Sequence, residues 1–264
     1  MKLGFIGTGN MATAIIGGLL SKGIAESGDI IGSARTEEHR KKAEDSLKIR
    51  MTADNAEVVR ESEILFLCVK PQMIEGVINE IKDEIREDQL IISIIAGKSI
   101  AWFENAFGKK IRLIRTMPNT PALVGEGMTA AVMGENVSED EKELALKLLG
   151  ACGQVEIVTE KLMDAVVAVS GSSPAYIFIL IEAMADAAVS EGMPRAQAYK
   201  FAAQAVLGSA KMALESGRHP AELKDMVCSP AGTTIEAVRV LEERGFRSSI
   251  IEAMKACAEV NRNL

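Results

Sequence analysis

Glycines and polar residues near the N-terminus have a spacing that suits a phosphate-binding turn. The segment Gly7-Thr8-Gly9-Asn10-Met11-Ala12 matches the pattern G-x-G-x-x-G/A. It directly follows Lys2–Ile6, a predicted strand, and it opens Asn10–Ser21, a predicted helix. Gly7 would permit the tight turn, Gly9 would let a pyrophosphate approach the backbone, and Ala12 would let the helix pack closely. The free N–H groups of the helix N-terminus favour phosphate, so the pattern predicts a dinucleotide site over a plain glycine turn.

The end of the second predicted strand, Asp29–Ser33, indicates which dinucleotide binds. A site specific for NAD carries an acidic residue there for the ribose hydroxyls, and this chain continues as Ala34-Arg35-Thr36 without one. The side chains of Ser33, Arg35 and Thr36 could instead bond a 2′-phosphate, and the planar guanidinium of Arg35 suits that anion. We therefore expect NADPH, with NADH as the alternative and with Arg35 as an ordinary surface arginine in that case.

Short apolar runs alternate with helical stretches through residues 1–160 and predict a doubly wound Rossmann-type sheet of the α/β class. Apart from the first two strands, the predicted strands are Ile49–Met51, Ile64–Val69, Leu90–Ile95 and Ile111–Arg115, with Met128–Met133 and Gln154–Val158 extending one edge. Further helices are predicted at Thr36–Ser46, Ala53–Arg60 and Glu139–Gly150.

Residues 161–264 predict an all-helical second domain. Helices are expected at Pro174–Ser190, Arg195–Glu215, Pro220–Met226, Thr233–Arg244 and Ser248–Arg262. The first of these is apolar on almost every side up to Leu180, and such a helix must be buried. About 100 residues offer little material to cover it, so we expect a homo-oligomer that assembles through this half. A compact monomeric bundle is the alternative.

Composition excludes several classes of protein. The formal net charge of −7 disfavours binding to the phosphate backbone of nucleic acids. The four cysteines form no CxxC pair, and the chain has only two histidines, so we expect no metal site, reduced thiols and a cytoplasmic location. Unbroken apolar runs such as Ala175–Ile181 are far shorter than the roughly 20 residues of a membrane helix, so no membrane association is expected.

A set of further motifs resembles the Δ1-pyrroline-5-carboxylate reductase family over the whole length of the chain. Its most specific part is Ser229-Pro230-Ala231-Gly232-Thr233-Thr234-Ile235, supported by Gly171-Ser172-Ser173-Pro174-Ala175-Tyr176. The family commonly has Gly-Gly where this chain has Ala231-Gly232, and Gly-Ser-Gly-Pro where it has Gly171-Ser172-Ser173-Pro174. Each change replaces one small residue by another, so it affects the expected substrate contacts and leaves the expected class of enzyme unchanged.

The resemblance implies NAD(P)H-dependent reduction of pyrroline-5-carboxylate to L-proline, the last step of proline biosynthesis. It implies a helical domain that interlocks two subunits, and dimers that assemble further into a decamer. Carried over motif by motif, the cofactor would contact Ile6, Gly7, Thr8, Gly9, Asn10, Met11, Ser33, Asn55, Val69, Lys70, Pro71, Gln72, Ala96 and Gly97. The substrate would meet Gly232, Thr233 and Thr234 in a pocket completed by the partner chain.

The loop Ser229–Thr234 precedes a predicted helix whose first N–H groups are unpaired, so these donors could hold the substrate carboxylate. The hydroxyl of Thr234 could hydrogen-bond the ring nitrogen, which makes Thr234 the candidate catalytic residue. By spacing alone, Ser229, Thr233 and Thr234 would more simply be helix caps. Lys70 could be misread as a catalytic lysine, but its place beside Pro71 after a strand suggests a cofactor-side loop.

Two other functions are compatible with a Rossmann-type domain. A β-hydroxyacid dehydrogenase would carry a lysine in a G-x-x-x-K-x-x-N segment on its interdomain helix. The corresponding helix here begins at Gly171 and contains no lysine before Lys200. A nucleotide sensor without enzymatic activity is the remaining alternative, and the sequence does not exclude it.

Overall fold

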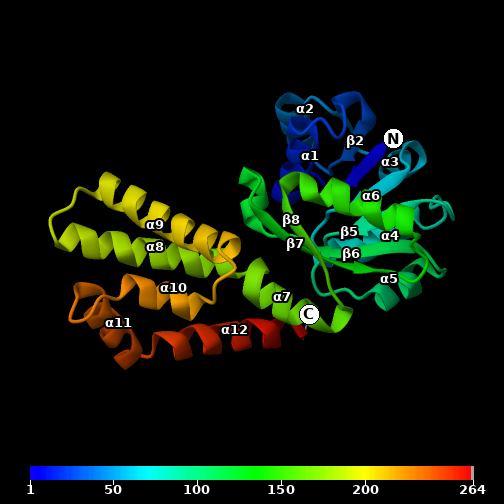
Figure 1. Cartoon of the computed structure of the whole chain (residues 1–264). Coiled ribbons are helices and arrows are strands. Elements are labelled where there is room, and N and C mark those ends of the chain that lie inside the picture. Colours follow the sequence, from blue (N-terminus) through cyan, green and yellow to red (C-terminus); the bar gives the residue numbers. More distant parts are fainter. Residues whose placement is uncertain (263–264) are drawn as a thin grey trace. The chain divides into compact units, whose positions relative to one another are not determined.

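The computed structural model describes residues 1–262 and divides into two compact units. The first unit contains Met1–Ser172 together with the C-terminal residues from Cys257 onward, and the second contains Ser173–Ala256. Figure 1 colours both units by sequence, from blue at the N-terminus to red at the C-terminus.

The first unit is built on an eight-stranded sheet in the order β3-β2-β1-β4-β5-β6-β7-β8. All neighbouring strands are parallel except β6 and β7, which are antiparallel. The strands are β1 (Leu3–Ile6), β2 (Ile30–Ser33), β3 (Arg50–Thr52), β4 (Ile64–Leu67), β5 (Leu90–Ser93), β6 (Arg112–Met117), β7 (Gly127–Met133) and β8 (Gly153–Ile157). The order of strands changes sides at β1: β2 and β3 lie on one side of it, and β4 begins the other side. Ligands bind at such switch points in open α/β sheets.

Helices cover both faces of this sheet (Figure 1). They are α1 (Asn10–Ser21), α2 (Glu37–Leu47), α3 (Asn55–Glu61), α4 (Ile74–Ile81), α5 (Ile100–Phe107) and α6 (Glu139–Leu149). The short helix α7 (Met163–Val166) packs against β7 through Met163, and the end of α12 (Phe246–Arg262) also belongs to this unit. Three begin at residues whose side chains accept a backbone N–H: Thr36 for α2, Asp54 for α3 and Ser99 for α5. Helix α6 begins with a capping box between Ser138 and Glu141.

Strand residues alternate between two hydrophobic cores, one on each face. Leu3, Phe5 and Phe66 belong to the core that includes residues of α1, α2 and α6. Ile6 and Leu67 belong to the core that includes residues of α3, α4 and α5. The rings of Phe5 and Phe66 stack with their centroids 4.4 Å apart, which joins β1 to β4 at the switch point. Successive side chains of a strand point to opposite faces, and both faces are covered by a core. Such a strand is therefore apolar without interruption.

The second unit contains α8 (Ser173–Ser190), α9 (Arg195–Glu215), α10 (Pro220–Val227), α11 (Thr233–Glu243) and most of α12. Helices α8 and α9 lie side by side and antiparallel (Figure 1). Only Ala185, Ala198 and Ala202 are buried among the described residues of this unit. Large apolar side chains remain exposed, for example Phe178 at 62%, Ile179 at 65% and Leu214 at 85%. The unit therefore has almost no core of its own in the single chain.

The predicted fold class is confirmed, and most predicted elements agree with the structure to within a residue or two at each end. Three elements had not been assigned from the sequence, namely α4, α5 and α7 with the π-helical turn Val167–Gly171 that follows it. The expectation about membrane-length segments also needs correction. The helical stretch Glu160–Ser190 has 31 residues and is, by length and composition alone, apolar enough to cross a membrane. The uncharged polar segment Ser170–Pro174 separates its two apolar runs, Ala165–Val169 and Ala175–Ile181, and hid this length in the sequence.

Candidate functional site

The turn between β1 and α1 has the geometry that a phosphate group requires. Gly7 has φ of 91°, and a Cβ there would lie 2.9 Å from the carbonyl oxygen of Cys68, so only glycine fits. Gly9 is the N-cap of α1 and makes no side-chain capping bond, and a Cβ there would meet nothing within 4 Å. The first turn of α1 contains no acidic residue. Unpaired backbone amides therefore face open space at a helix N-terminus, which suits an anion.

Other residues around this turn converge on the same place. The backbone N–H of Gly7 donates to the carbonyl oxygen of Ser33 at 3.1 Å, and Ile6 pairs in register with Ser33. Ala12 is fully buried beneath the turn, and Asn10 and Met11 begin α1. The Thr8 hydroxyl is buried and has no hydrogen-bond partner, which is costly unless a ligand or water supplies one. These observations fit a dinucleotide, whose pyrophosphate and ribose would offer acceptors here.

The tip of β2 lies beside this turn. Ser33 is only 2% exposed, and its hydroxyl donates to Oδ1 of Asn55 at 2.6 Å, while Nδ2 of Asn55 donates to Glu80 at 2.6 Å. The two predicted cofactor residues Ser33 and Asn55 are thus in contact. Arg35 is exposed, and its guanidinium has no hydrogen-bond or ion-pair partner among residues 1–262.

Two neighbours of Arg35 have roles that its sequence context did not reveal. The Arg40 side chain folds back and donates from Nη1 to the carbonyl oxygens of Ala34 and Arg35, at 2.8 and 3.1 Å. This bond brings a second guanidinium to the backbone of the tip. The hydroxyl of Thr36 accepts the N–H of His39 and caps α2, so it is engaged in the folded chain.

The loops that follow β4, β5 and β6 lie at the same edge of the parallel part of the sheet. Val69 and Lys70 lead into a 3-10 helix, Pro71–Met73; Lys70 and Gln72 are exposed, whereas Val69 and Pro71 are partly buried. Ala96 and Gly97 follow β5, and Gly97 has φ of 75°. Beneath Gly7, burial raises the pKa of the Cys68 thiol, so this cysteine carries no thiolate at neutral pH.

The β6 loop is joined to the π-helical turn by an asparagine. Asn119 is 8% exposed; its Nδ2 donates to the carbonyl oxygen of Ser170 at 3.0 Å, and its Oδ1 accepts the N–H of Met128 at 2.8 Å. The segment Met117-Pro118-Asn119-Thr120-Pro121 therefore has a structural role in fixing this loop within the first unit.

In the second unit, the N-terminus of α11 is not capped by a side chain. Its N-cap is Gly232, with φ of −82° and no side-chain capping bond. The preceding Ala231 has a left-handed φ of 57°, and the Gly232 N–H donates to the carbonyl oxygen of Ser229 at 3.0 Å. The first amides of α11 remain available beside Thr233 and Thr234. The capping alternative for Ser229, Thr233 and Thr234 is therefore wrong in this structure.

The first unit also contains a group of charged residues that motif and spacing do not reveal in the sequence. Arg115 lies on β6 and is 7% exposed, and its Nη1 bonds Oε1 of Glu160 at 2.9 Å. The same oxygen accepts the N–H of Ile100, the first residue of α5, at 2.9 Å. The available signal was Arg115 at the end of the predicted strand Ile111–Arg115, because a charge buried in a sheet requires a partner. No cluster of three His, Cys, Asp or Glu side chains within residues 1–262 could hold a metal ion.

Comparisons with known proteins place this arrangement among described families. A model described as "Pyrroline-5-carboxylate reductase dimerisation" matches residues 160–264, and one described as "NADP oxidoreductase coenzyme F420-dependent" matches residues 2–97. The pyrroline-5-carboxylate reductase of Escherichia coli strain K12 is 49% identical over 100% of this chain and 98% of its own length. That of Methanosarcina acetivorans is 46% identical over 100% and 97%.

A solved structure shows the same fold. The crystal structure of Plasmodium falciparum pyrroline carboxylate reductase with NADP bound has a TM-score of 0.91 and 30% sequence identity to this chain. The match covers 100% of this chain and 97% of that one. Relatives of this identity and coverage establish kinship along the whole chain, in both units.

Proposed function

The chain belongs to the pyrroline-5-carboxylate reductase family, and from that premise we propose that it reduces Δ1-pyrroline-5-carboxylate to L-proline with NAD(P)H, as the final step of proline biosynthesis. The observation that carries the proposal is the identity of 49% to the E. coli reductase over the full length of the chain. The open helix N-terminus at Gly9 supports it from the structure.

In this proposal the cofactor is held by the edge of the sheet at the switch point. When bound, NADPH supplies the hydride, and the protein supplies binding and orientation. The amides at the start of α1 hold the pyrophosphate, and Ser33 and Asn55 form one wall of the ribose site. The loops at Val69–Gln72 and Ala96–Gly97 enclose the remaining part, with Lys70 as a loop residue.

The substrate site is assigned to the N-terminus of α11. The uncapped amides of Gly232, Thr233 and Thr234 hold the substrate carboxylate without an arginine. The Thr234 hydroxyl orients the ring nitrogen, and its high pKa makes water or the substrate the source of the proton. The reaction breaks the C=N double bond, adds hydride to the carbon and a proton to the nitrogen, and leaves the ring closed.

The preference for NADPH rests on the tip of β2. The tip, residues 33–36, contains no acidic residue. The Arg35 guanidinium is exposed and has no partner among the described residues. A planar, permanently charged group with free donors suits a phosphate. NADH remains the second cofactor that the site would accept.

The exposed apolar surface of the second unit supports a homodimer. Helices α8 and α9 expose Phe178, Ile179 and Leu214 in the single chain, and large apolar side chains exposed on neighbouring helices mark an interaction surface. The dimerisation model matches this region, so we assign the covering to a second copy of the chain instead of lipid. On the same basis we propose dimers that assemble further into a decamer, a cytoplasmic enzyme, a cofactor-binding domain at residues 1–160 and a dimerisation domain at residues 161–264.

Steady-state kinetics on the purified protein test the proposed activity. NADPH oxidation is followed with pyrroline-5-carboxylate, with hydroxy acids and with keto acids, and each is repeated with NADH. We expect turnover with the cyclic imine alone and a higher kcat/KM for NADPH. Turnover of a hydroxy acid would favour a β-hydroxyacid dehydrogenase, and cofactor binding without turnover of any substrate would favour a nucleotide sensor.

A further inference from the structure

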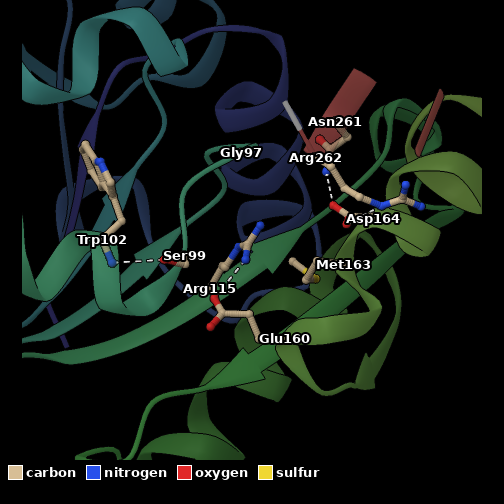
Figure 2. A pocket seen from close by; sticks show the side chains of 9 residues that line it. All are labelled: Gly97, Ser99, Trp102, Arg115, Glu160, Met163, Asp164, Asn261 and Arg262. Atoms are coloured by element: carbon tan, nitrogen blue, oxygen red, sulfur yellow. Dashed lines mark hydrogen bonds and ion pairs between the residues drawn. The ribbon is translucent and has the colours of Figure 1, made fainter. Parts of the chain in front are cut away.

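A cavity in the first unit is formed by side chains that the proposed reaction does not use. Its volume is about 300 Å³. It lies between the start of α5, the strand β6, the segment that leads into α7, and the last residues described for α12 (Figure 2). The residues that line it are Gly97, Ser99, Trp102, Arg115, Glu160, Met163, Asp164, Asn261 and Arg262. Only Gly97 is shared with the proposed cofactor site.

The guanidinium of Arg115 is incompletely satisfied in this cavity. Its side chain is 9% exposed, and Nη1 is the one nitrogen of the group that has a partner among the described residues. Its Nε is buried and has no hydrogen-bond partner. A guanidinium carries five N–H donors, and burying donors without acceptors costs free energy. The wall of the cavity therefore offers a positive group that an acceptor on a ligand would satisfy.

The partner of Arg115 offers the opposite charge at the same place. Oε1 of Glu160 accepts both Nη1 of Arg115 and the N–H of Ile100, each at 2.9 Å, whereas Oε2 has no partner among residues 1–262. Figure 2 shows the two side chains pointing toward each other. Oε1 of Glu160 thus fixes the start of α5, and Oε2 remains available to a ligand.

A second pair completes the charge balance of the cavity. Asp164 accepts Nδ2 of Asn261 at 2.7 Å and lies 3.3 Å from Nε of Arg262 (Figure 2). The lining therefore contains two guanidinium groups and two carboxylates, and its formal charge is zero. A neutral lining of this kind does not favour a simple anion or a simple cation over solvent ions.

We propose that this cavity is a binding site for a small zwitterion, an α-amino acid whose carboxylate faces Arg115 and whose ammonium group faces Glu160. An α-amino acid carries its opposite charges on neighbouring atoms of one carbon, so a single molecule can meet both members of an ion pair in contact. Charge-assisted bonds at both ends are the strong class of hydrogen bond. A volume of about 300 Å³ suits a small molecule, as ligand sites begin near this size.

The only tryptophan of the chain reports on this site. Trp102 lines the cavity, and Nζ of Lys98 lies 4.9 Å from the centre of its ring. Its fluorescence is titrated with glycine, L-alanine and L-serine, and with acetate and ethylamine, which carry one charge each. We expect a saturable change with at least one amino acid and none with acetate or ethylamine. Glu160→Gln keeps an acceptor for Ile100 but removes the charge, and should weaken binding at least tenfold.

Glu139→Gln is the matched control, because Glu139 is exposed on α6 and pairs only with Lys142 on the surface. It should bind as the unmodified protein does. Arg262→Gln provides a second variant on an exposed residue and should weaken binding as well. The proposal is overturned if no amino acid gives a saturable change, if acetate matches the amino acids, or if Glu160→Gln binds equally well. Turnover measured in parallel keeps the two ideas separate, since an active enzyme that binds no amino acid here contradicts this site alone.

Discussion

Replacing Gly9 by alanine isolates ligand binding from folding. The backbone of Gly9 has φ of −75° and ψ of −174°, a conformation that any L-residue adopts. An added Cβ would meet no atom within 4 Å, so the folded chain has room for it. Alanine is a poorer N-cap than glycine, which should lower the free energy of unfolding by about 1 kcal/mol at most.

The expected loss of affinity follows from the space that the methyl group would occupy. It would stand in front of the first amides of α1, which have no side-chain partner. A hydrogen bond from such an amide to a charged phosphate is worth about 1.5–3 kcal/mol. Losing one of these bonds should therefore weaken NADPH binding about 10- to 150-fold, at 1.4 kcal/mol for each factor of ten.

The assay is a fluorescence titration with NADPH, combined with a thermal melt of each variant. Gly17→Ala is the matched control, because Gly17 lies inside α1 and an added Cβ would also meet nothing within 4 Å. It should bind NADPH normally and gain about 1 kcal/mol of stability. Gly7→Ala should lower Tm, because its φ is 91°. The reasoning fails if Gly9→Ala keeps its Tm and binds NADPH within twofold of the unmodified protein.

Three further predictions concern single side chains. Thr234→Ala should lower kcat at least tenfold and leave NADPH affinity nearly unchanged, and equal losses in both would contradict its assignment. Arg35→Glu should move the ratio of kcat/KM for NADPH and NADH toward NADH by about tenfold or more, because a carboxylate repels the 2′-phosphate; an unchanged ratio would show that Arg35 does not contact it. Burial raises the pKa of the Cys68 thiol, so alkylation at pH 8, followed by mass spectrometry, should modify Cys68 only after unfolding in urea. Rapid modification in the folded protein would disprove this.

The first unit could be predicted from the sequence because its central strands β1, β2, β4 and β5 are buried on both faces. Ile64–Leu67 is apolar without a break, and its residues alternate between two cores, which only a covered parallel sheet requires. The turn at Gly7 could also be predicted, since its positive φ and its close approach to the carbonyl oxygen of Cys68 require a glycine. The reversed direction of β7 against β6 could not, because strand direction depends on pairing partners that local pattern does not encode.

The charged cavity could not be predicted for a similar reason. Arg115 and Glu160 are 45 residues apart in the chain. Their contact depends on the parallel pairing of β8 with β7, which places the segment after β8 close to β6. Helix α5 was not assigned because it spans only eight residues, of which only Phe103 and Phe107 are buried, so a helical period is hard to recognise in the sequence. The role of Arg40 was hidden because a basic residue in a charged helix normally faces solvent, whereas here it bonds two carbonyl oxygens of the preceding loop.

The exposed face of α8 and α9 shows where a single chain ceases to be the folding unit. The sequence predicted burial of an apolar helix, and Phe178 and Ile179 are nevertheless exposed in the isolated chain. The proposed second copy of the chain would supply the covering that the sequence pattern requires. The helix pattern could thus indicate that a partner is needed, but not the geometry of the contact.

The central claim is hydride transfer from the cofactor to the imine carbon. The most direct test supplies NADPH that carries two deuterium atoms at C4 of the nicotinamide, together with pyrroline-5-carboxylate, and analyses the product by mass spectrometry and NMR. We expect L-proline with one deuterium, located at C5, and one NADPH consumed for each proline formed. Proline without deuterium, or oxidation of NADPH without formation of proline, would contradict the account.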